Sequence, residues 1–198
     1  MREQLPAIIV FSPFFAALLC PFCAALSKKL AQFTAAFFTG ISLVLSIVML
    51  FLIDKQGEAV YWFGGWVPPY GIEFSVDSLS AVILVLICTI GFLTMIYGIP
   101  FMKNESRQNC AGYYAVLSLL VCGLLGNTAT ADVFNLYVFL EITSLSGYVL
   151  IAMGGSRGVI SAFRYLLIGT IGASFYLLGV AFIYGETGTL NMQDMAGL

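Results

Sequence analysis

Long apolar runs constrain this chain more than any other feature of its sequence. A helix that crosses a bilayer takes about 20 predominantly apolar residues, and six windows meet that requirement: residues 5–26, 31–53, 76–99, 111–130, 133–153 and 159–184. Only helices and closed barrels span hydrocarbon, because every backbone polar group must be paired inside the protein. The runs lack the alternation of barrel strands. The sequence therefore predicts an all-α integral membrane fold, with residues 1–198 as a single membrane domain.

Composition narrows the possible partners and cofactors. Charged residues make up 9% of the chain and hydrophobic residues 61%, whereas soluble domains are about a quarter charged. The sequence has no basic block typical of nucleic-acid binding and no flavin, haem or iron–sulfur signature. It also has no histidine, the commonest metal ligand and near-neutral proton relay. We therefore expect a lipid bilayer as its surroundings, no nucleic acid, no metal and no cofactor. Any proton relay must use carboxylates, Lys, Arg, hydroxyls and water.

Cys20 and Cys23 match the C-x-x-C pattern, which in a soluble protein indicates redox or metal chemistry. Here the pair lies inside an apolar run, without a companion pair and without a βαβ setting. A buried free cysteine behaves as a small hydrophobic side chain. The sequence favours this packing role.

The first apolar run and the basic residues predict the orientation. The run Leu5–Leu26 is longer than the apolar region of a signal peptide, so we expect a retained first span. Loops on one side of the membrane carry most of the basic residues, namely Lys28, Lys29, Lys103, Arg107 and Arg157. The opposite side carries Arg2, Lys55, Asp54, Glu58, Glu73, Glu186 and Asp194. Basic loops stay inside, which predicts both termini on the outer side.

The longest connection between the predicted spans, residues 54–75, is rich in aromatic residues that include Trp62 and Trp66. Trp and Tyr are enriched at the membrane–water interface. We therefore expect this segment to lie along the surface as an irregular or short β-like loop. The run Gly154–Gly158 predicts a break between the fifth and sixth helices.

Glu141 is the first candidate site residue, because it is a carboxylate in the middle of the apolar run 133–153. A charge at that depth costs at least a few kcal/mol, and such residues usually face a polar cavity and lie on an ion or proton path. The alternative is a glutamate that only hydrogen-bonds a neighbouring helix. Thr143 and Ser144 lie within one turn of Glu141 and are weaker candidates for supporting proton transfer.

Arg164 is the second candidate, because it is the one basic residue inside a predicted span. It lies roughly 6–9 Å from the inner end of its helix, and Glu141 lies roughly 18 Å from that end of its own helix. The resulting gap of about 9 Å or more excludes direct contact in register. Arg164 either snorkels to the inner surface or lines the same polar cavity as Glu141, linked to it through water.

Polar and small residues near the last two windows have structural explanations as well. Asp132 precedes the fifth window, where its side chain could cap the helix; a functional role is the alternative. Small and hydroxylated residues, among them Gly147 and Gly172, allow close helix approach and interhelical hydrogen bonds. Packing accounts for most of them.

The run Asp132–Ile142 resembles the fifth-helix motif of antiporter-like membrane subunits. These subunits occur in Mrp-type multisubunit cation:proton antiporters, in membrane-bound hydrogenases and in respiratory complex I. Other runs are similar to the family's third helix with its entering loop, to its sixth helix and to the loop that follows: Trp66–Ile72, Val76–Ser80, Ser161–Leu167 and Gly188–Met192. The likeness covers most of the chain after the first two windows and is strongest to the MrpD-type component of Mrp antiporters.

The resemblance implies roles for both candidates. In the family, the fifth-helix glutamate, here Glu141, is the acidic end of a proton path and is coupled to a lysine on the seventh helix. A basic residue at the position of Arg164 modulates the same charge pair. The resemblance further implies a subunit that translocates protons and monovalent cations such as sodium. It would work with other membrane subunits of a complex in a prokaryotic cell membrane.

The sequence departs from the family in length. Family members are longer and contain inverted repeats, whereas this sequence ends soon after the sixth window and places no lysine inside a span. The resemblance therefore implies a partial antiporter-like repeat. We expect either a fragment or a split subunit that is completed by another chain supplying the later helices.

Two alternatives to an antiporter subunit stay open. One is a structural membrane scaffold, in which Glu141 only fixes the register of its helix. The other is a proton-pumping membrane subunit of a hydrogenase or an NADH-quinone oxidoreductase complex. In that case the chain would belong to an enzyme complex without carrying its redox chemistry.

Overall fold

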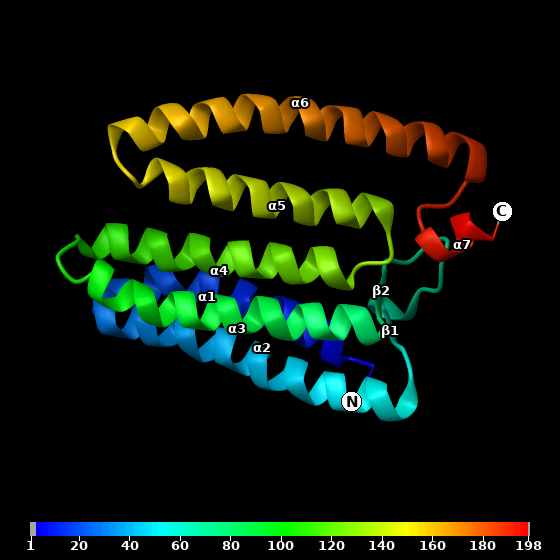
Figure 1. Ribbon diagram of the computed structural model, residues 1–198, viewed down its shortest axis with the longest axis horizontal. Coiled ribbons are helices and arrows are strands. Elements are labelled where there is room, and N and C mark those ends of the chain that lie inside the picture. The colour runs from blue at the N-terminus through cyan, green and yellow to red at the C-terminus, as the bar shows by residue number, and fades with distance from the viewer. Residues whose placement is uncertain (1–2, 198) are drawn as a thin grey trace.

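Six long helices run back and forth along one axis (Figure 1), and the computed structural model describes them within residues 3–197. Arg2 lies outside the described residues. The helices are α1 (Leu5–Leu26), α2 (Lys28–Gln56), α3 (Ser78–Phe101), α4 (Arg107–Ala129), α5 (Val133–Ala152) and α6 (Ser156–Thr187). Each of the six is long and apolar enough to cross a membrane. The predicted all-α membrane fold is confirmed.

Local capping lengthens α4 and α6 beyond the predicted windows. The Ser106 hydroxyl accepts a hydrogen bond from the Asn109 N–H at 3.1 Å, so α4 begins at Arg107 rather than at residue 111. Gly188 has φ 69°, a left-handed conformation that glycine adopts readily at a helix C-terminus, and α6 continues to that point. Hydropathy alone misses these turns because their residues are polar.

Helices α1 to α4 form a packed unit, and α5 and α6 are added to it as successive layers (Figure 1). Helix α1 packs on α2 and α4, α2 packs on α3, and α4 packs on α5, which carries α6. The packed unit buries large side chains from all four of its helices, including Ile9, Met49, Leu84, Tyr114 and Leu125. The outer layers expose rows of large apolar side chains, which in a membrane meet lipid or other helices.

The connection between α2 and α3 is a short hairpin at one end of the bundle. Strand β1 (Ala59–Trp62) pairs antiparallel with β2 (Glu73–Val76), and a 3₁₀ turn, η1 (Phe63–Gly65), follows β1. This is the short β-like form expected for residues 54–75. The last helix, α7 (Met192–Ala196), lies at the same end of the molecule (Figure 1).

The two ends of the bundle carry opposite charge. The end formed by the α1–α2, α3–α4 and α5–α6 connections holds Lys28, Lys29, Lys103, Arg107, Arg157 and one acid, Glu105. In the described residues, the hairpin end holds Lys55 with Glu3, Asp54, Glu58, Glu73, Asp77, Asp132, Glu186 and Asp194. Alternating helix directions place these loops together, so charges distant in sequence gather at one end.

Candidate functional site

Glu141 lies near the middle of α5, about 12 Å along the axis from Val133 by the 1.5 Å rise of a helix. Its side chain is half-buried. Among residues 3–197 its carboxylate has neither a hydrogen bond nor an ion pair. A carboxylate this deep in an apolar helix and without a partner in the described chain must find one in water, in an ion or in another helix.

Two tyrosine contacts define how α5 lies against α6. Tyr137 stacks on Tyr176 with ring centroids 6.2 Å apart and an angle of 11°, and the Tyr176 hydroxyl donates to the Val133 carbonyl at 3.0 Å. Farther along the helix pair, the ring centroids of Tyr148 and Tyr165 are 5.9 Å apart. These contacts fix the antiparallel register of the two helices.

Glu141 lies on α5 between the two tyrosine contacts. Residues 137, 141, 144 and 148 recur at the spacing of one helix face, so Glu141 and Ser144 share the α6-facing side with both tyrosines. Glu141 is one turn beyond Tyr137, and Gly172 is one turn before Tyr176, which puts them at the same level of the antiparallel pair. This position places the carboxylate beside α6 rather than beside α4.

Two glycines of α6 face this region differently. A Cβ added at Gly169 would meet the Tyr148 hydroxyl oxygen at 1.8 Å, so that glycine permits the close approach of the two helices. A Cβ added at Gly172 would have no other part of the described chain within 4 Å. Gly172 is exposed, so no described segment covers α6 at the level of Glu141.

Arg164 is exposed on α6 and has no hydrogen bond or ion pair among the described residues. It immediately precedes Tyr165, which lies opposite Tyr148, so it is level with the residue that follows Tyr148. That level is about eight residues, or roughly 12 Å, from Glu141. Within residues 3–197 the two candidates are not brought into contact, and their separation is similar to the gap expected from sequence.

Thr143 lies on a different face of α5 from Glu141. Its hydroxyl donates to the Phe139 carbonyl at 2.8 Å and accepts from the Asn127 Nδ2 amide at 3.3 Å. The Phe139 ring packs on Gly126 of α4. Thr143 therefore belongs to the α4–α5 contact, whereas Ser144 remains on the side of Glu141.

Asn127 is a polar residue that sequence reasoning missed. Its Oδ1 atom is buried and has no hydrogen-bond partner in the described structure. A buried amide oxygen in this state usually binds an ordered water. The available signal was an amide side chain inside an otherwise apolar window.

A polar cluster at the hairpin end holds the start of α5. The Glu73 carboxylate is 5% exposed and accepts from the Asn191 Nδ2 amide at 2.8 Å. Backbone bonds join the same segments: the Ala131 N–H donates to the Glu73 carbonyl at 3.0 Å, and the Met192 N–H donates to the Ala131 carbonyl at 2.8 Å. The segment after α6 is thereby tied to the connection that positions α5.

Asp132 is the N-cap of α5, as the structural interpretation predicted. Its Oδ1 atom accepts from the Asn135 N–H at 2.6 Å, and the side chain is 7% exposed. Burial raises the pKa of Asp132, and the hydrogen bonds from the Asn135 and Phe134 backbones oppose that rise.

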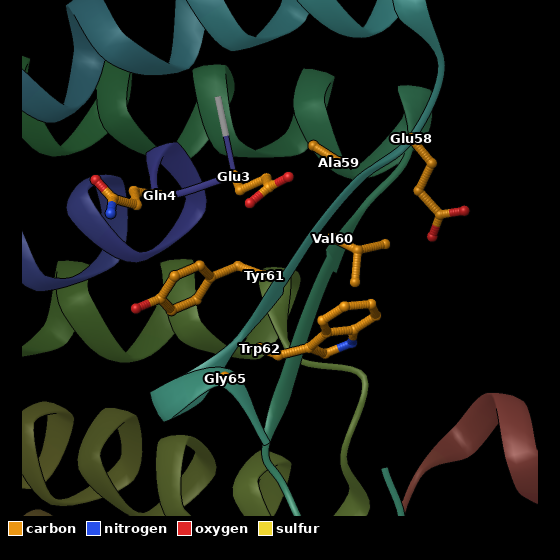
Figure 2. Close-up of a pocket in the computed structure, with 8 residues that line it drawn as sticks. All are labelled: Glu3, Gln4, Glu58, Ala59, Val60, Tyr61, Trp62 and Gly65. Atoms are coloured by element: carbon orange, nitrogen blue, oxygen red, sulfur yellow. The ribbon is translucent and has the colours of Figure 1, made fainter. Parts of the chain in front are cut away.

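A hollow beside β1 contains two further carboxylates (Figure 2). Glu3 precedes α1 and Glu58 precedes β1, and in this view their carboxylates lie apart, on either side of the β1 ribbon. Residues 3–197 contain no group of three or more Cys, Asp or Glu side chains that could hold a metal ion. The described cysteines form no disulfide bonds. The Cys20 thiol donates a hydrogen bond to the Ala31 carbonyl at 3.6 Å, and the Cys23 sulfur accepts one from the Thr34 hydroxyl at 3.4 Å.

Two family models match the sequence. Residues 68–110 match the model described as NADH-Ubiquinone oxidoreductase (complex I), chain 5 N-terminus. Residues 130–198 match the model described as NADH:quinone oxidoreductase/Mrp antiporter, TM. The second match includes both Glu141 and Arg164.

Relatives from two kinds of complex are similar to the chain. The N subunit of the NADH-quinone oxidoreductase of Desulforudis audaxviator (strain MP104C) is 42% identical, covering 100% of this chain and 40% of that protein. The D subunit of the Na(+)/H(+) antiporter of Bacillus subtilis (strain 168) is 30% identical, covering 80% of this chain and 32% of that protein. The chain thus spans well under half the length of these relatives.

A solved structure supports the same family. A chain in the structure of the membrane-bound sulfane sulfur reductase, an archaeal respiratory membrane complex, is 31% identical with a TM-score of 0.91. The alignment covers 98% of this chain and 40% of that one. Sequence models, relatives and fold agree on one assignment: the chain belongs to the family of antiporter-like membrane subunits found in Mrp-type antiporters and in complex I.

Proposed function

We propose that the chain is a proton- and monovalent-cation-translocating subunit of a multisubunit membrane antiporter complex, with Glu141 as its protonatable site. The observation that carries this proposal is the position of Glu141. It is half-buried in mid-helix, lacks a partner among the described residues, and lies level with the exposed Gly172. Relatives that include a component of an Na(+)/H(+) antiporter support the same function.

The chemistry follows from the surroundings of the carboxylate. In an apolar environment the neutral acid is favoured, and the approach of a cation favours the ionised form. A cation that approaches and leaves Glu141 would therefore release and reload its proton. Water is required to link this position to either end of the bundle, because no described side chain bridges the distance.

In this proposal, the positive charge of Arg164 acts on Glu141 from a distance. Its guanidinium is permanently charged, and its long side chain can reach along α6 from a level about 12 Å away. We infer that it modulates the charge balance around Glu141 without touching it. The exposed position of Arg164 is compatible with a partner or a water chain on that side.

The orientation follows from the charge at the two ends of the bundle. Basic residues concentrate at the end opposite the hairpin, and acids concentrate at the hairpin end. By the positive-inside rule, the basic end lies on the inner side of a prokaryotic cell membrane and both termini lie outside. Other membrane subunits would cover the exposed faces of α5 and α6, including a chain that supplies later helices.

Substitution of Glu141 tests the function directly. The complex carrying Glu141→Gln, purified with its native partners and reconstituted in vesicles, should lose cation-driven proton flux by about a hundredfold or more, because the amide cannot carry the proton. Glu186→Gln, which removes an exposed carboxylate at the end of α6, is the matched control and should transport normally. Normal flux by an assembled Glu141→Gln complex would rule out the proposed role.

A second candidate is a proton-pumping subunit of an electron-transfer complex. It is favoured by the 42% identity to a component of a quinone oxidoreductase and by the likeness to a respiratory membrane complex. Flux measurements on the purified complex with and without an electron donor separate the two. Transport driven by a cation gradient alone supports the antiporter, and strict dependence on a donor supports the electron-transfer complex.

A further inference from the structure

Four basic side chains surround a hollow at the end of the bundle opposite the hairpin. We name it the basic hollow; it encloses about 660 Å³, within the range of small-molecule sites. Its lining includes Lys28, Lys29, Lys103 and Arg107 together with the apolar Ile99 and Pro100. The basic residues come from the starts of α2 and α4 and from the α3–α4 connection, so the hollow exists only in the folded bundle.

The positive charge of the basic hollow is not neutralised by its own lining, which contains no acid. The Lys28 ammonium donates to the backbone carbonyls of Lys103 and Glu105 and so is held in place without meeting a carboxylate. The Glu105 carboxylate, the one acid at this end in the described residues, accepts instead from the Asn109 Nδ2 amide at 2.8 Å. Four clustered cations without a neighbouring acid favour the binding of an anion.

The apolar walls continue into the surface that faces lipid. Ile99 is 43% exposed, and the neighbouring Phe101 is 69% exposed at the end of α3. Arg107 also lines a second hollow, which runs beside α1 and α4 and includes Pro21 and Gly112. The guanidinium thus lies between two recesses at the level where the spans end and lipid headgroups begin.

We propose that the basic hollow binds the headgroup of an anionic phospholipid, with its acyl chains lying against the apolar wall of α3 and the recess beside α1. Charge complementarity favours a headgroup of net negative charge, and the apolar walls favour the acyl chains. A small free anion would use the cations but leave the apolar walls without a ligand. Basic pockets between transmembrane helices bind anionic headgroups in this way.

Native mass spectrometry of the full chain, delipidated in mild detergent, tests the site. Phosphatidylglycerol is titrated against phosphatidylcholine with identical acyl chains, and Arg107→Gln is compared with Arg157→Gln. Arg157 is the matched control, because it lies at the start of α6 at the same end of the bundle but outside the hollow. Circular dichroism confirms folding, and the exposed pair Lys29→Gln with Lys103→Gln replaces Arg107→Gln if that variant does not fold.

The expected result is preferential binding of phosphatidylglycerol that weakens about fivefold in Arg107→Gln, the effect of one basic residue near an anionic lipid, and stays unchanged in Arg157→Gln. Three results would overturn the proposal. They are equal affinity for the two lipids, equal weakening by the two arginine variants, and displacement of phosphatidylglycerol by an equal concentration of inorganic phosphate, which would indicate a small-anion site.

Discussion

The α1–α4 unit and the α5–α6 pair are both built from helices apolar enough to cross a membrane, but they bury those helices differently. More than half of the most apolar window of α4 is buried, at 56%, compared with 6% for α6. The four-helix unit therefore carries most of the packing within the described chain. The α5–α6 pair carries the charged residues of the membrane interior. These residues are not enclosed by the described chain and so face lipid, water or other helices. The difference separates the part that stabilises this fold from the part expected to move protons.

The largest expected contrast is between two tyrosines. Tyr114 is fully buried in the four-helix unit, and its hydroxyl donates to the Met95 carbonyl at 3.2 Å, whereas Tyr165 on α6 is 63% exposed. Tyr114→Ala should lower the free energy of unfolding by about 3–5 kcal/mol, as for other large buried aromatics. Tyr165→Ala should cost less than about 1 kcal/mol. Unfolding in mixed micelles measures both, and equal losses would contradict the division between the two regions.

A pair of glycines sharpens the comparison. A Cβ added at Gly126 would meet the Phe139 ring at 2.2 Å, whereas one added at Gly172 has open space. Gly126→Val should destabilise the isolated chain by about 1–3 kcal/mol through overpacking, and Gly172→Val should leave its stability nearly unchanged. Thermal unfolding in detergent gives both values.

The same glycine variants test the scaffold alternative in the assembled complex. If the chain is only a scaffold, Gly172→Val should break assembly, while Glu141→Gln should be silent. Size-exclusion chromatography of the complex reports assembly, and proton flux reports transport. Intact assembly with lost flux in Glu141→Gln supports a working carboxylate.

The smallest expected effects are two opposite pH dependences at the hairpin end. Burial raises the pKa of Asp132 above its ordinary value of 3.8, so its contribution to stability is greatest at low pH and declines as the pH rises through the raised pKa. Hydrogen bonds from the Ser80 N–H and hydroxyl lower the pKa of Asp77, so its contribution is lost as the pH falls below 3.8. We expect the free energy of unfolding, measured between pH 3 and 7, to depend less on pH above pH 4 in Asp132→Asn than in the native chain. The Asn amide of this variant still caps α5. An unchanged profile would contradict the raised pKa.

Local patterns in the sequence predict much of this fold for physical reasons. Hydropathy over about 20 residues identifies each span, because the bilayer sets the length. The Asp132 cap follows from a carboxylate placed just before an apolar run. The depth of Glu141 follows from the rise of a helix. Each of these features depends on neighbouring residues alone.

The remaining features depend on contacts between distant segments. The Asn191 amide bonds to Glu73 across 118 positions of sequence, and no local pattern indicates that pairing. Similarly, Thr143 and Ser144 are adjacent in sequence but lie on different faces of α5: Thr143 bonds to Asn127 of α4, whereas Ser144 lies on the side of Glu141. The Tyr137–Tyr176 stack fixes which part of α6 lies level with Glu141. The alignment of one helix against another depends on how side chains from distant segments pack together. A linear sequence does not show this packing.

The protonation of Glu141 within the membrane is the central claim, and infrared difference spectroscopy measures it most directly. The chain in lipid nanodiscs is stepped in pH, and the spectra of the native protein and Glu141→Gln are subtracted. Protonation of Glu141 should give a carboxylic acid carbonyl band that appears as the pH falls and is absent from Glu141→Gln. Identical spectra for the two proteins across the whole pH range would contradict it.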